Sequence, residues 1–384
     1  MVSPNKISVM VSAGEASSDA HAAHALDALR TLGIAFDSFG MGAGALEKSG
    51  TELIVDCRDL AVIGFVDVLI NYPKFLKRLR KLREHMQERK PDLLLLVDYP
   101  DFNLKLAETA KTLGIPVLFY VSPQVWAWRA GRVPRIGSLV SHMAVLFPFE
   151  VNIYEEHDIP VTYVGNPVVA DAVSTLTTIG ARELMELNPE HPVVTLLPGS
   201  RIGEIRRNLP PMLASAKLIA ERLPNCQFLL PVAPTLEPSF IQQSIGSNGP
   251  ANLHCTTNDS RNAMRAADVA LVASGTATLE TALIGTPMVV MYIVNKINYA
   301  IMKRLIKIPD ISLVNIVAGK RVVPEYVQAD AKPEAMANDV LSLLSDESRR
   351  STMLSELNRV KSLMGDAGAS TRVAQLIVQL TNKP

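Results

Sequence analysis

Short apolar runs of strand length alternate with helix-length amphipathic segments in the first part of the chain. The apolar runs lie at 6–12, 34–39, 52–55, 92–97, 116–121, 142–146 and 161–164, and the helical segments at 18–32, 74–89 and 102–113. Strands rich in valine and leucine that alternate with helices are typical of a parallel sheet covered on both faces. The pattern therefore predicts an α/β fold.

Gly165-Asn166-Pro167 interrupts this alternation, and the same scheme then begins again. Further apolar runs lie at 193–197, 227–231, 252–255, 269–273 and 288–292, and residues 332–380 have a helical pattern. We expect two Rossmann-like domains that face each other across a cleft, with the boundary near Gly165 to Val168. Ligands of such sheets bind beyond the carboxyl ends of the strands, so we expect the chemistry in the turns that follow strands.

Composition narrows the possible functions. The 384 residues are 48% hydrophobic, which is enough for two cores, and 38 basic residues balance 38 acidic ones. The global positive field typical of nucleic-acid-binding proteins is missing, so we expect no nucleic-acid partner. Cys57, Cys226 and Cys255 are widely spaced and odd in number, as is usual for reduced cysteines of a cytoplasmic protein. We find neither a signal peptide's apolar core nor a membrane-spanning run.

One post-strand turn, at 267–280, has the features of a phosphate site. The apolar run 269–273 leads through Ser274, Gly275 and Thr276 into a predicted helix, whose first backbone amides lack partners and lie at the positive end of its dipole. Glu280 follows about one turn later, where its carboxylate can accept hydrogen bonds from ribose hydroxyls. The alternative is an ordinary turn with Ser274 as a capping residue.

Two turns in the first half carry carboxylates. Glu15 lies in a small-residue turn, and Asp19 in the same turn has a simpler explanation as a helix N-cap. Asp98 follows four leucines and a valine, so we expect it at the end of a buried strand. Partial desolvation there raises a carboxylate's pKa toward that of a usable general base.

Two further turns are unusual. The segment 120–129 contains both tryptophans, Trp126 and Trp128, beside Gln124 and Arg129, and it is either satellite core or a platform for a sugar or an acyl chain. In the segment 196–204, glycine and serine leave backbone N–H groups available as hydrogen-bond donors. Arg201 in the same segment offers a guanidinium group that can bind a diphosphate through two parallel hydrogen bonds. The chain has no Asp-x-Asp motif of the kind that holds a divalent metal.

The segment Gly40 to Ala45 matches a loose dinucleotide-binding pattern. Too few residues separate Gly44 from the next strand for a full crossover helix, so we do not expect a nicotinamide site there.

Two stretches combine apolar and basic residues as membrane-interface segments do. Residues 62–72 are mainly apolar, basic residues follow at 74–83, and residues 297–308 repeat the mixture. The alternative is a core helix with a solvated basic face. The side chains that we expect to face a membrane are Phe65, Val66, Val68, Leu69 and Phe75.

Six motifs occur in order over almost the whole chain, each weak alone and specific together. They are Ala13-Gly14-Glu15 with Ser17 and Asp19, Asp98-Tyr-Pro-Asp-Phe-Asn103, Val121-Ser-Pro-Gln-Val-Trp-Ala-Trp-Arg129, Leu197-Pro-Gly-Ser-Arg201 with Glu204, Ala273-Ser-Gly-Thr-Ala-Thr-Leu-Glu280 and Ser312-Leu-Val-Asn315. With these motifs the chain resembles the lipid A disaccharide synthases.

The resemblance implies a GT-B-fold, inverting, metal-independent glycosyltransferase of Gram-negative lipid A biosynthesis, without a cofactor. It implies transfer of 2,3-diacylglucosamine from UDP to 2,3-diacylglucosamine 1-phosphate, which forms the β-1,6-linked disaccharide 1-phosphate and UDP. The implied location is the cytoplasm, peripheral on the anionic inner face of the cytoplasmic membrane, with a homodimer possible. Residues 1–166 then form the acceptor and membrane-facing domain, 167–365 the UDP-sugar domain, and 366–384 a helix that packs on the first domain.

The resemblance also assigns site residues. Asp98 is the first candidate for the base, Glu15 is the second, and Arg201 assists the leaving group. The expected donor-binding residues are Gly199, Ser200, Arg201, Ser274, Gly275, Thr276, Glu280 and Asn315, and the expected acceptor-side residues are Gly14, Ser17, Asp19, Ser122, Gln124 and Trp126.

The sequence departs from the family's usual pattern at three positions. Ser18 stands where glycine is usual, Asn166 where histidine is usual, and Val314 where proline is usual. Three alternatives share part of the pattern: a UDP-sugar epimerase or peptidoglycan-pathway glycosyltransferase, a nicotinamide oxidoreductase, and a non-catalytic nucleotide-sugar or membrane-binding protein.

Overall fold

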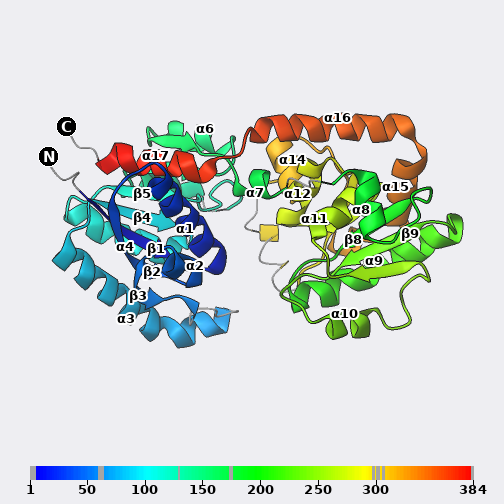
Figure 1. The fold of residues 1–384 in the computed structure, drawn as a ribbon, viewed down its shortest axis with the longest axis horizontal. Helices are drawn as coiled ribbons and strands as arrows, with labels where there is room; N and C mark the ends of the chain where they lie inside the picture. The colour runs from blue at the N-terminus through cyan, green and yellow to red at the C-terminus, as the bar shows by residue number, and fades with distance from the viewer. Residues whose placement is uncertain are drawn as a thin grey trace. The chain divides into compact units, whose positions relative to one another are not determined.

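The computed structural model describes residues 6–58, 65–128, 130–172, 176–295, 299, 303–304 and 308–381, and the side chains of residues 65–72 lie outside that description. The chain divides into two compact units (Figure 1). Met1–Pro167 and Asp366–Pro384 form the first unit, and Val168–Gly365 form the second. Each unit is built on one parallel sheet.

The first unit has a seven-stranded sheet in the order β3-β2-β1-β4-β5-β6-β7. Its strands are β1 (Ile7–Ala13), β2 (Phe36–Gly42), β3 (Glu52–Asp56), β4 (Leu93–Val97), β5 (Val117–Tyr120), β6 (His142–Val145) and β7 (Val161–Tyr163). Its helices are α1 (Ala16–Thr31), α2 (Gly44–Lys48), α3 (Phe65–Arg89), α4 (Pro100–Thr112), the 3-10 turn η2 (Ala130–Arg132), α5 (Val133–Gly137), α6 (Glu150–Glu155) and α17 (Ala369–Thr381).

Helices cover both faces of this sheet, which is why β4 is apolar and buried along its whole length. On one face, Leu82 of α3 and Phe102 of α4 pack into the core. On the other face, Leu26 of α1 and Ile377 of α17 do the same, and α1 and α17 lie against each other (Figure 1). The end of the chain is therefore part of the core of the first unit.

Strand β2 extends to Gly42, whereas the sequence pattern placed its end at residue 39. A Cβ atom on Gly40 would lie 2.0 Å from the carbonyl oxygen of Val11 in β1. Glycine is needed at this position because the two strands approach closely, so the glycine segment begins as strand rather than as a ligand-binding loop.

The second unit has a six-stranded sheet in the order β10-β9-β8-β11-β12-β13. Its strands are β8 (Val193–Leu197), β9 (Gln227–Pro231), β10 (Leu253–Thr256), β11 (Val269–Ala273), β12 (Met288–Tyr292) and β13 (Glu325–Val327). Its helices are α7 (Pro167–Asp171), α8 (Thr178–Leu184), α9 (Ile202–Arg222), α10 (Pro238–Ile245), α11 (Ser260–Ala266), α12 (Thr276–Ile284), α14 (Leu313–Ala318), the 3-10 turn η3 (Gln328–Asp330), α15 (Pro333–Ser345) and α16 (Glu347–Met364).

The strand order reverses at one point in each sheet. In the first unit this point lies between β1 and β4, and in the second between β8 and β11. Ligands of doubly wound parallel sheets bind beyond the carboxyl ends of the strands at such points. The turns that follow these four strands contain Glu15, Asp98, Arg201 and Ser274, all predicted site residues.

Candidate active site

The turn after β4 holds two consecutive residues in a conformation that L-amino acids rarely adopt. Asp98 has φ 51° and Tyr99 has φ 47°. The Asn103 side chain stabilises this turn, because its Nδ2 donates to the carbonyl oxygen of Asp98 at 2.6 Å. Its Oδ1 accepts a hydrogen bond from the Ser12 hydroxyl in β1 at 2.6 Å. Asn103 thus joins the ends of β1 and β4 and holds a strained turn, a feature that is frequent at functional sites.

The carboxylate of Asp98 is half-buried at this turn. Burial raises the pKa of Asp98, the nearby Glu15 carboxylate raises it further, and the backbone amide of Tyr99 opposes the rise. The structure thus brings the two predicted base candidates within electrostatic reach of each other. Gly14 lies against the Tyr99 ring, since a Cβ atom there would be 2.4 Å from Tyr99 Cδ1, while Ser17 is exposed on α1.

A cavity of about 250 Å³ opens beside Asp98, beyond the ends of β4, β5 and β6. Val121 at its wall is another strained residue, with φ 67° on a β-branched side chain. The lining residues are Asp98, Pro100, Val121, Ser122, Pro123, Gln124, Trp126, Trp128, Leu146, Phe147 and Glu150.

Glu150 is a lining residue that the sequence analysis did not identify. Its Oε2 accepts hydrogen bonds from the backbone amides of Leu146 and Phe147 at 3.1 and 3.0 Å. Burial raises its pKa to about 7, and the two amides and the side chains of Trp126 and Ser122 oppose the rise. The sequence feature that could have identified Glu150 as a candidate is its position shortly after the predicted strand 142–146.

Two residues expected on the acceptor side have structural partners. Asp19 does not cap its own helix: Oδ1 accepts from the amide of Ala43 at 2.6 Å, and Oδ2 accepts from the amide of Ala45 at 2.8 Å. Its carboxylate thus occupies the start of α2, where the loose dinucleotide pattern would require a phosphate. The Ser122 hydroxyl lies 2.7 Å from the Tyr154 hydroxyl and 2.9 Å from the carbonyl oxygen of the next residue.

In the second unit, helix α12 begins without a side-chain cap. Its N-cap, Gly275, has no side chain that could accept from the first amides, and the first turn of the helix contains no acidic residue. Ser274 is not the capping residue of the alternative explanation, because its hydroxyl donates to the carbonyl oxygen of Ile311 at 3.0 Å. The amides of Thr276 and Ala277 lie at the positive end of the α12 dipole, and both residues line the cavity described below.

Helix α9 begins differently, because Glu204 occupies its anion site. Glu204 Oε2 accepts from the amides of Ser200 and Arg201 at 3.0 and 3.3 Å. The amide of Ser200 is therefore not free, contrary to the expectation from sequence. Gly199 has φ 116°, and a Cβ atom there would lie 2.4 Å from Glu204 Oε2, so this position requires glycine. The side chain of Arg201 is 81% exposed.

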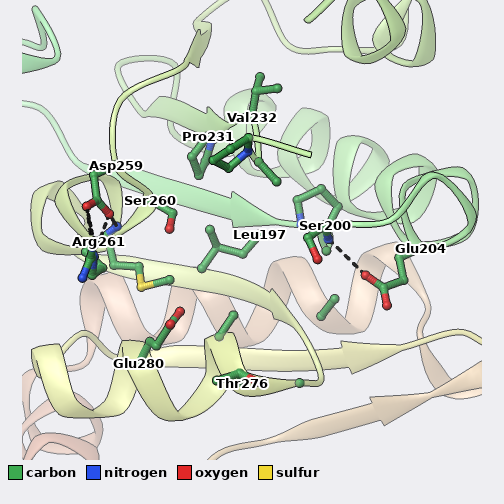
Figure 2. Close-up of a pocket in the computed structure, with 18 of the residues that line it drawn as sticks. Leu197, Ser200, Glu204, Pro231, Val232, Asp259, Ser260, Arg261, Thr276 and Glu280 are labelled. Carbon is green, nitrogen blue, oxygen red and sulfur yellow. Dashed lines mark hydrogen bonds and ion pairs between the residues drawn. The ribbon is translucent and has the colours of Figure 1, made fainter. Parts of the chain in front are cut away.

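A cavity of about 880 Å³ lies between these two helix starts (Figure 2). It brings together all the predicted donor-binding residues except Asn315. Its lining residues are Asp171, Leu197, Pro198, Gly199, Ser200, Arg201, Glu204, Pro231, Val232, Ala233, Pro234, Thr257, Asn258, Asp259, Ser260, Arg261, Met264, Ala273, Ser274, Gly275, Thr276, Ala277 and Glu280. A cavity of this size accommodates a nucleotide-sized ligand.

Glu280 points from α12 into this cavity (Figure 2). Burial raises the pKa of its carboxyl, Arg261 opposes the rise, and Asp171 and Asp259 add to it. The Asp259 carboxylate holds the Arg261 guanidinium, with Nε 2.8 Å from Oδ1 and 3.0 Å from Oδ2. Asp259 and Arg261 were not predicted, because the turn after β10 has no glycine-rich motif.

Asn315 is buried outside the cavity. Its Nδ2 donates to Glu325 Oε1 at 2.7 Å, and its Oδ1 accepts from the amides of Val322 and Val323. Glu325 also accepts a hydrogen bond from the amide of Ile311. The carbonyl oxygen of Ile311 in turn accepts the hydrogen bond from the Ser274 hydroxyl. Asn315 therefore acts on the segment that supports the start of α12, at one remove from the cavity.

The predicted membrane-facing segments are described only in part. Residues 59–64 and the side chains of 65–72, including Phe65, Val66, Val68 and Leu69, lie outside the described residues, as do Arg129 and most of 296–307. Phe75 is half-buried, and its ring meets that of Phe102 edge-on with centroids 5.0 Å apart. Of the basic residues of α3, Lys74 and Lys77 are exposed, whereas Lys81 donates to a backbone carbonyl oxygen of β3.

Two absences hold for the described part of the chain. No helix there combines the length and apolar character needed to span a bilayer. No group of three or more His, Cys, Asp and Glu side chains there is arranged to hold a metal ion.

Solved structures of nucleotide-sugar enzymes share the fold. The chain is similar to MurG of Acinetobacter baumannii, with a TM-score of 0.59 and 16% identity over 97% of this chain and 99% of that one. It is also similar to UDP-GlcNAc 2-epimerase of Neisseria meningitidis, with a TM-score of 0.58 and 13% identity over 97% and 99%. At such low identity these likenesses establish the fold alone, two Rossmann-like domains of the GT-B type.

Sequence relatives are much closer. The chain is 42% identical to the lipid-A-disaccharide synthase of Syntrophus aciditrophicus and 41% identical to that of Myxococcus xanthus, over 98% and 99% of this chain and 98% of each relative. The sequence profile of the lipid-A-disaccharide synthetase family matches residues 9–378. These matches favour the expected glycosyltransferase over the epimerase and peptidoglycan-pathway alternatives. The chain belongs to the lipid-A-disaccharide synthetase family.

Proposed function

We propose that the protein transfers 2,3-diacylglucosamine from UDP to 2,3-diacylglucosamine 1-phosphate with inversion at the anomeric carbon. The observation that carries the site assignment is the uncapped start of α12, with Arg201 and Glu280 in the same cavity. The UDP diphosphate binds at the α12 amides and Arg201, and Glu280 accepts hydrogen bonds from the ribose hydroxyls. The helix start and the guanidinium stabilise the leaving UDP, as oxyanion donors do elsewhere.

The acceptor binds in the first unit, and Asp98 acts as its general base. The Asp98 carboxylate takes the proton of the acceptor 6-hydroxyl as that oxygen attacks the anomeric carbon of the donor. The bond from this carbon to the UDP oxygen breaks, and its electron pair leaves with UDP. The raised pKa of Asp98 supports this role, because a base is most effective when its pKa approaches the working pH. Glu15 is the second candidate.

Lipid substrates bring the protein to a bilayer. Each acyl methylene lifted into water costs about 0.8 kcal/mol, so the enzyme must reach its lipids at the membrane, here the anionic inner face of the cytoplasmic membrane. The apolar stretch before residue 73 and the exposed Lys74 and Lys77 support docking through the start of α3.

The test of the mechanism is turnover of Asp98→Asn with both substrates in detergent. We expect kcat to fall by about 10²- to 10⁴-fold, because the base is lost, while UDP binding in the second unit stays unchanged. Asp101→Asn is the matched control, since Asp101 is exposed in the first turn of α4. Turnover of Asp98→Asn within a few-fold of wild type would remove Asp98 from the mechanism.

A further inference from the structure

Trp126 and Glu150 line the cavity beside Asp98, and the proposed reaction assigns no role to either side chain. Trp126 Nε1 is a buried atom without a hydrogen-bond partner among the described residues. Glu150 lies in the same cavity wall. The Trp126 side chain is close enough to Glu150 to lower the pKa of the Glu150 carboxyl. A buried polar atom without a partner is costly, so its presence at a cavity indicates a ligand contact.

The backbone fixes the position of Glu150. The amides of Leu146 and Phe147 hold its Oε2, and Glu150 is one of the residues that line the cavity. The indole of Trp126 is fixed as well, because it packs edge-on against Phe149 with centroids 5.4 Å apart. A carboxyl group and an indole are thus both held in place at the wall of a cavity that Asp98 also lines.

A hydroxyl group is the ligand that satisfies both atoms. It donates a hydrogen bond to a carboxylate and accepts one from an indole N–H. Aromatic walls beside carboxylates also suit a sugar, whose C–H face packs on a ring while its hydroxyls bond to the oxygens.

The chemistry of the acceptor leaves one hydroxyl for this place. In 2,3-diacylglucosamine 1-phosphate, positions 2 and 3 carry acyl chains, position 1 carries phosphate, and the 6-hydroxyl is the nucleophile, so the 4-hydroxyl remains. We propose that Glu150 and Trp126 bind the acceptor's 4-hydroxyl and thereby position its 6-hydroxyl at Asp98. This inference rests on the proposed function.

The experiment compares acceptor KM and kcat of Glu150→Gln and Trp126→Phe with those of wild type. We expect Glu150→Gln to raise the acceptor KM by about 10- to 100-fold, because a charge-assisted hydrogen bond is lost, and Trp126→Phe to raise it by about 3- to 10-fold. The donor KM stays unchanged. Glu155→Gln, on the exposed side of the same helix, is the matched control.

A 4-deoxy acceptor identifies the hydroxyl. On wild type it should show the raised KM of the variants, and on Glu150→Gln it should show no further rise, because the same contact cannot be lost twice. The inference is wrong if the increases in acceptor KM caused by the 4-deoxy acceptor and by Glu150→Gln multiply when the two are combined. It is also wrong if the acceptor KM of Glu150→Gln equals that of wild type.

Structural damage and failure of the mechanism give other patterns. The glutamine of the Glu150→Gln variant can still accept from both backbone amides, and a melting curve checks that the variant folds. A purely capping role would lower the melting temperature and leave the acceptor KM unchanged. Should Glu150→Gln fail to fold, Trp126→Phe with both acceptors decides. Asp98→Asn is measured in parallel, so that an error in the proposed base is recognised by its own unchanged kcat.

Discussion

At the scale of single residues, Arg201 and Glu280 make separable contributions to the proposed binding of UDP in the cavity of about 880 Å³. Arg201 is exposed and approaches Glu204 only at 3.5 Å, so its removal leaves the fold intact. We expect Arg201→Ala to weaken UDP binding by about 10- to 100-fold and to slow transfer as well, because the diphosphate contact exists before and during the reaction. Isothermal titration with UDP and steady-state kinetics measure the two effects.

Glu280→Ala should mainly raise the KM of the donor, since ribose contacts do not change during transfer. The matched control for both variants is Arg206→Ala, an exposed cation of α9 outside the cavity. An effect of Glu280→Ala on kcat alone would contradict its assignment to ribose.

Glu150 also gives a prediction about stability and pH. Its pKa is about 7 in the folded protein against an ordinary value of 4.5, so its contribution to stability is complete below about 4.5 and is lost as the pH rises through about 7. Glu150→Gln does not ionise. Between about pH 5 and about pH 8, we expect wild type to lose about 2 kcal/mol of unfolding free energy relative to the variant. Urea titrations at both pH values measure this difference, and an unchanged difference would place the carboxyl in a more polar environment.

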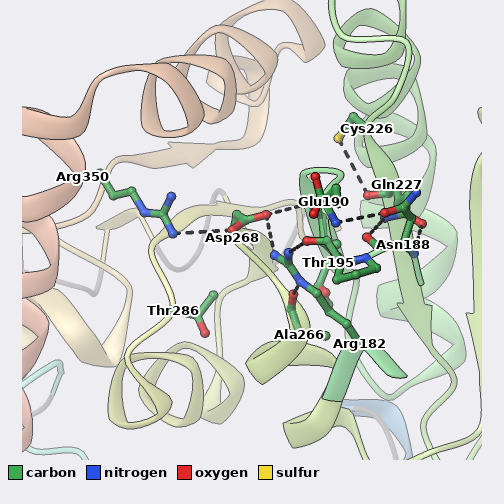
Figure 3. Close-up of polar contacts among 12 residues, drawn as sticks. Arg182, Asn188, Glu190, Thr195, Cys226, Gln227, Ala266, Asp268, Thr286 and Arg350 are labelled. Carbon is green, nitrogen blue, oxygen red and sulfur yellow. Dashed lines mark hydrogen bonds and ion pairs between the residues drawn. The ribbon is translucent and has the colours of Figure 1, made fainter. Parts of the chain in front are cut away.

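At the scale of elements, one buried arginine ties together the second unit (Figure 3). Arg182 of α8 donates to the carbonyl oxygens of Pro189 and Ala266 and to Asp268 Oδ2, each within 3.0 Å. Asp268 Oδ2 also accepts from the amide of Val193 in β8, and Oδ1 lies 3.6 Å from Arg350 of α16. The network joins segments that lie far apart in the sequence.

We expect Arg182→Met to lower the free energy of unfolding by roughly 3 kcal/mol, because it leaves a largely buried carboxylate and two carbonyl oxygens without their donor. Arg350→Met removes the solvent-exposed partner of the same carboxylate and should cost about 1 kcal/mol or less. Urea unfolding followed by circular dichroism measures both. Equal losses of unfolding free energy in the two variants would show that the buried Arg182–Asp268 pair stabilises the fold no more than the Arg350–Asp268 pair does. Both tryptophans lie in the first unit. The unfolding transition followed by tryptophan fluorescence should therefore shift less than the transition followed by circular dichroism.

At the scale of the whole molecule, a variant of the apolar stretch before residue 73 tests the proposed membrane contact. The variant changes Val66, Val68 and Leu69 to serine and keeps Phe75, whose ring packs on Phe102. We expect weaker co-sedimentation with anionic vesicles and unchanged transfer between detergent-solubilised substrates. Raised salt should weaken the basic part of the binding more than the apolar part.

Ile179 and Leu184 provide the control for this experiment, because they are 62% and 48% exposed on α8 of the second unit. Changing both to serine removes exposed apolar surface elsewhere and should leave sedimentation unchanged. If the first variant sediments like wild type, the docking surface lies outside the start of α3.

The sequence by itself determined the features that depend on neighbours along the chain. The alternation of apolar runs and helices predicted two parallel sheets, because burial on both faces requires continuous apolar strands. The turns after strands predicted where Asp98, Arg201 and Glu280 would lie, because parallel strands end at one edge of a sheet. The fold and the family were thus predictable, and the family is confirmed by the relatives.

Only the tertiary structure decided which polar groups are already taken. Asp19 fills the start of α2, Glu204 fills the start of α9, and Asn315 holds the loop at 322–323, whereas the start of α12 has no side-chain cap. Two backbone amides hold Glu150 in the wall of the cavity beside Asp98, and no sequence motif indicates this contact. These roles depend on hydrogen-bond partners brought together by folding, because a carboxylate binds whichever donor packing places beside it, and sequence spacing does not specify that donor.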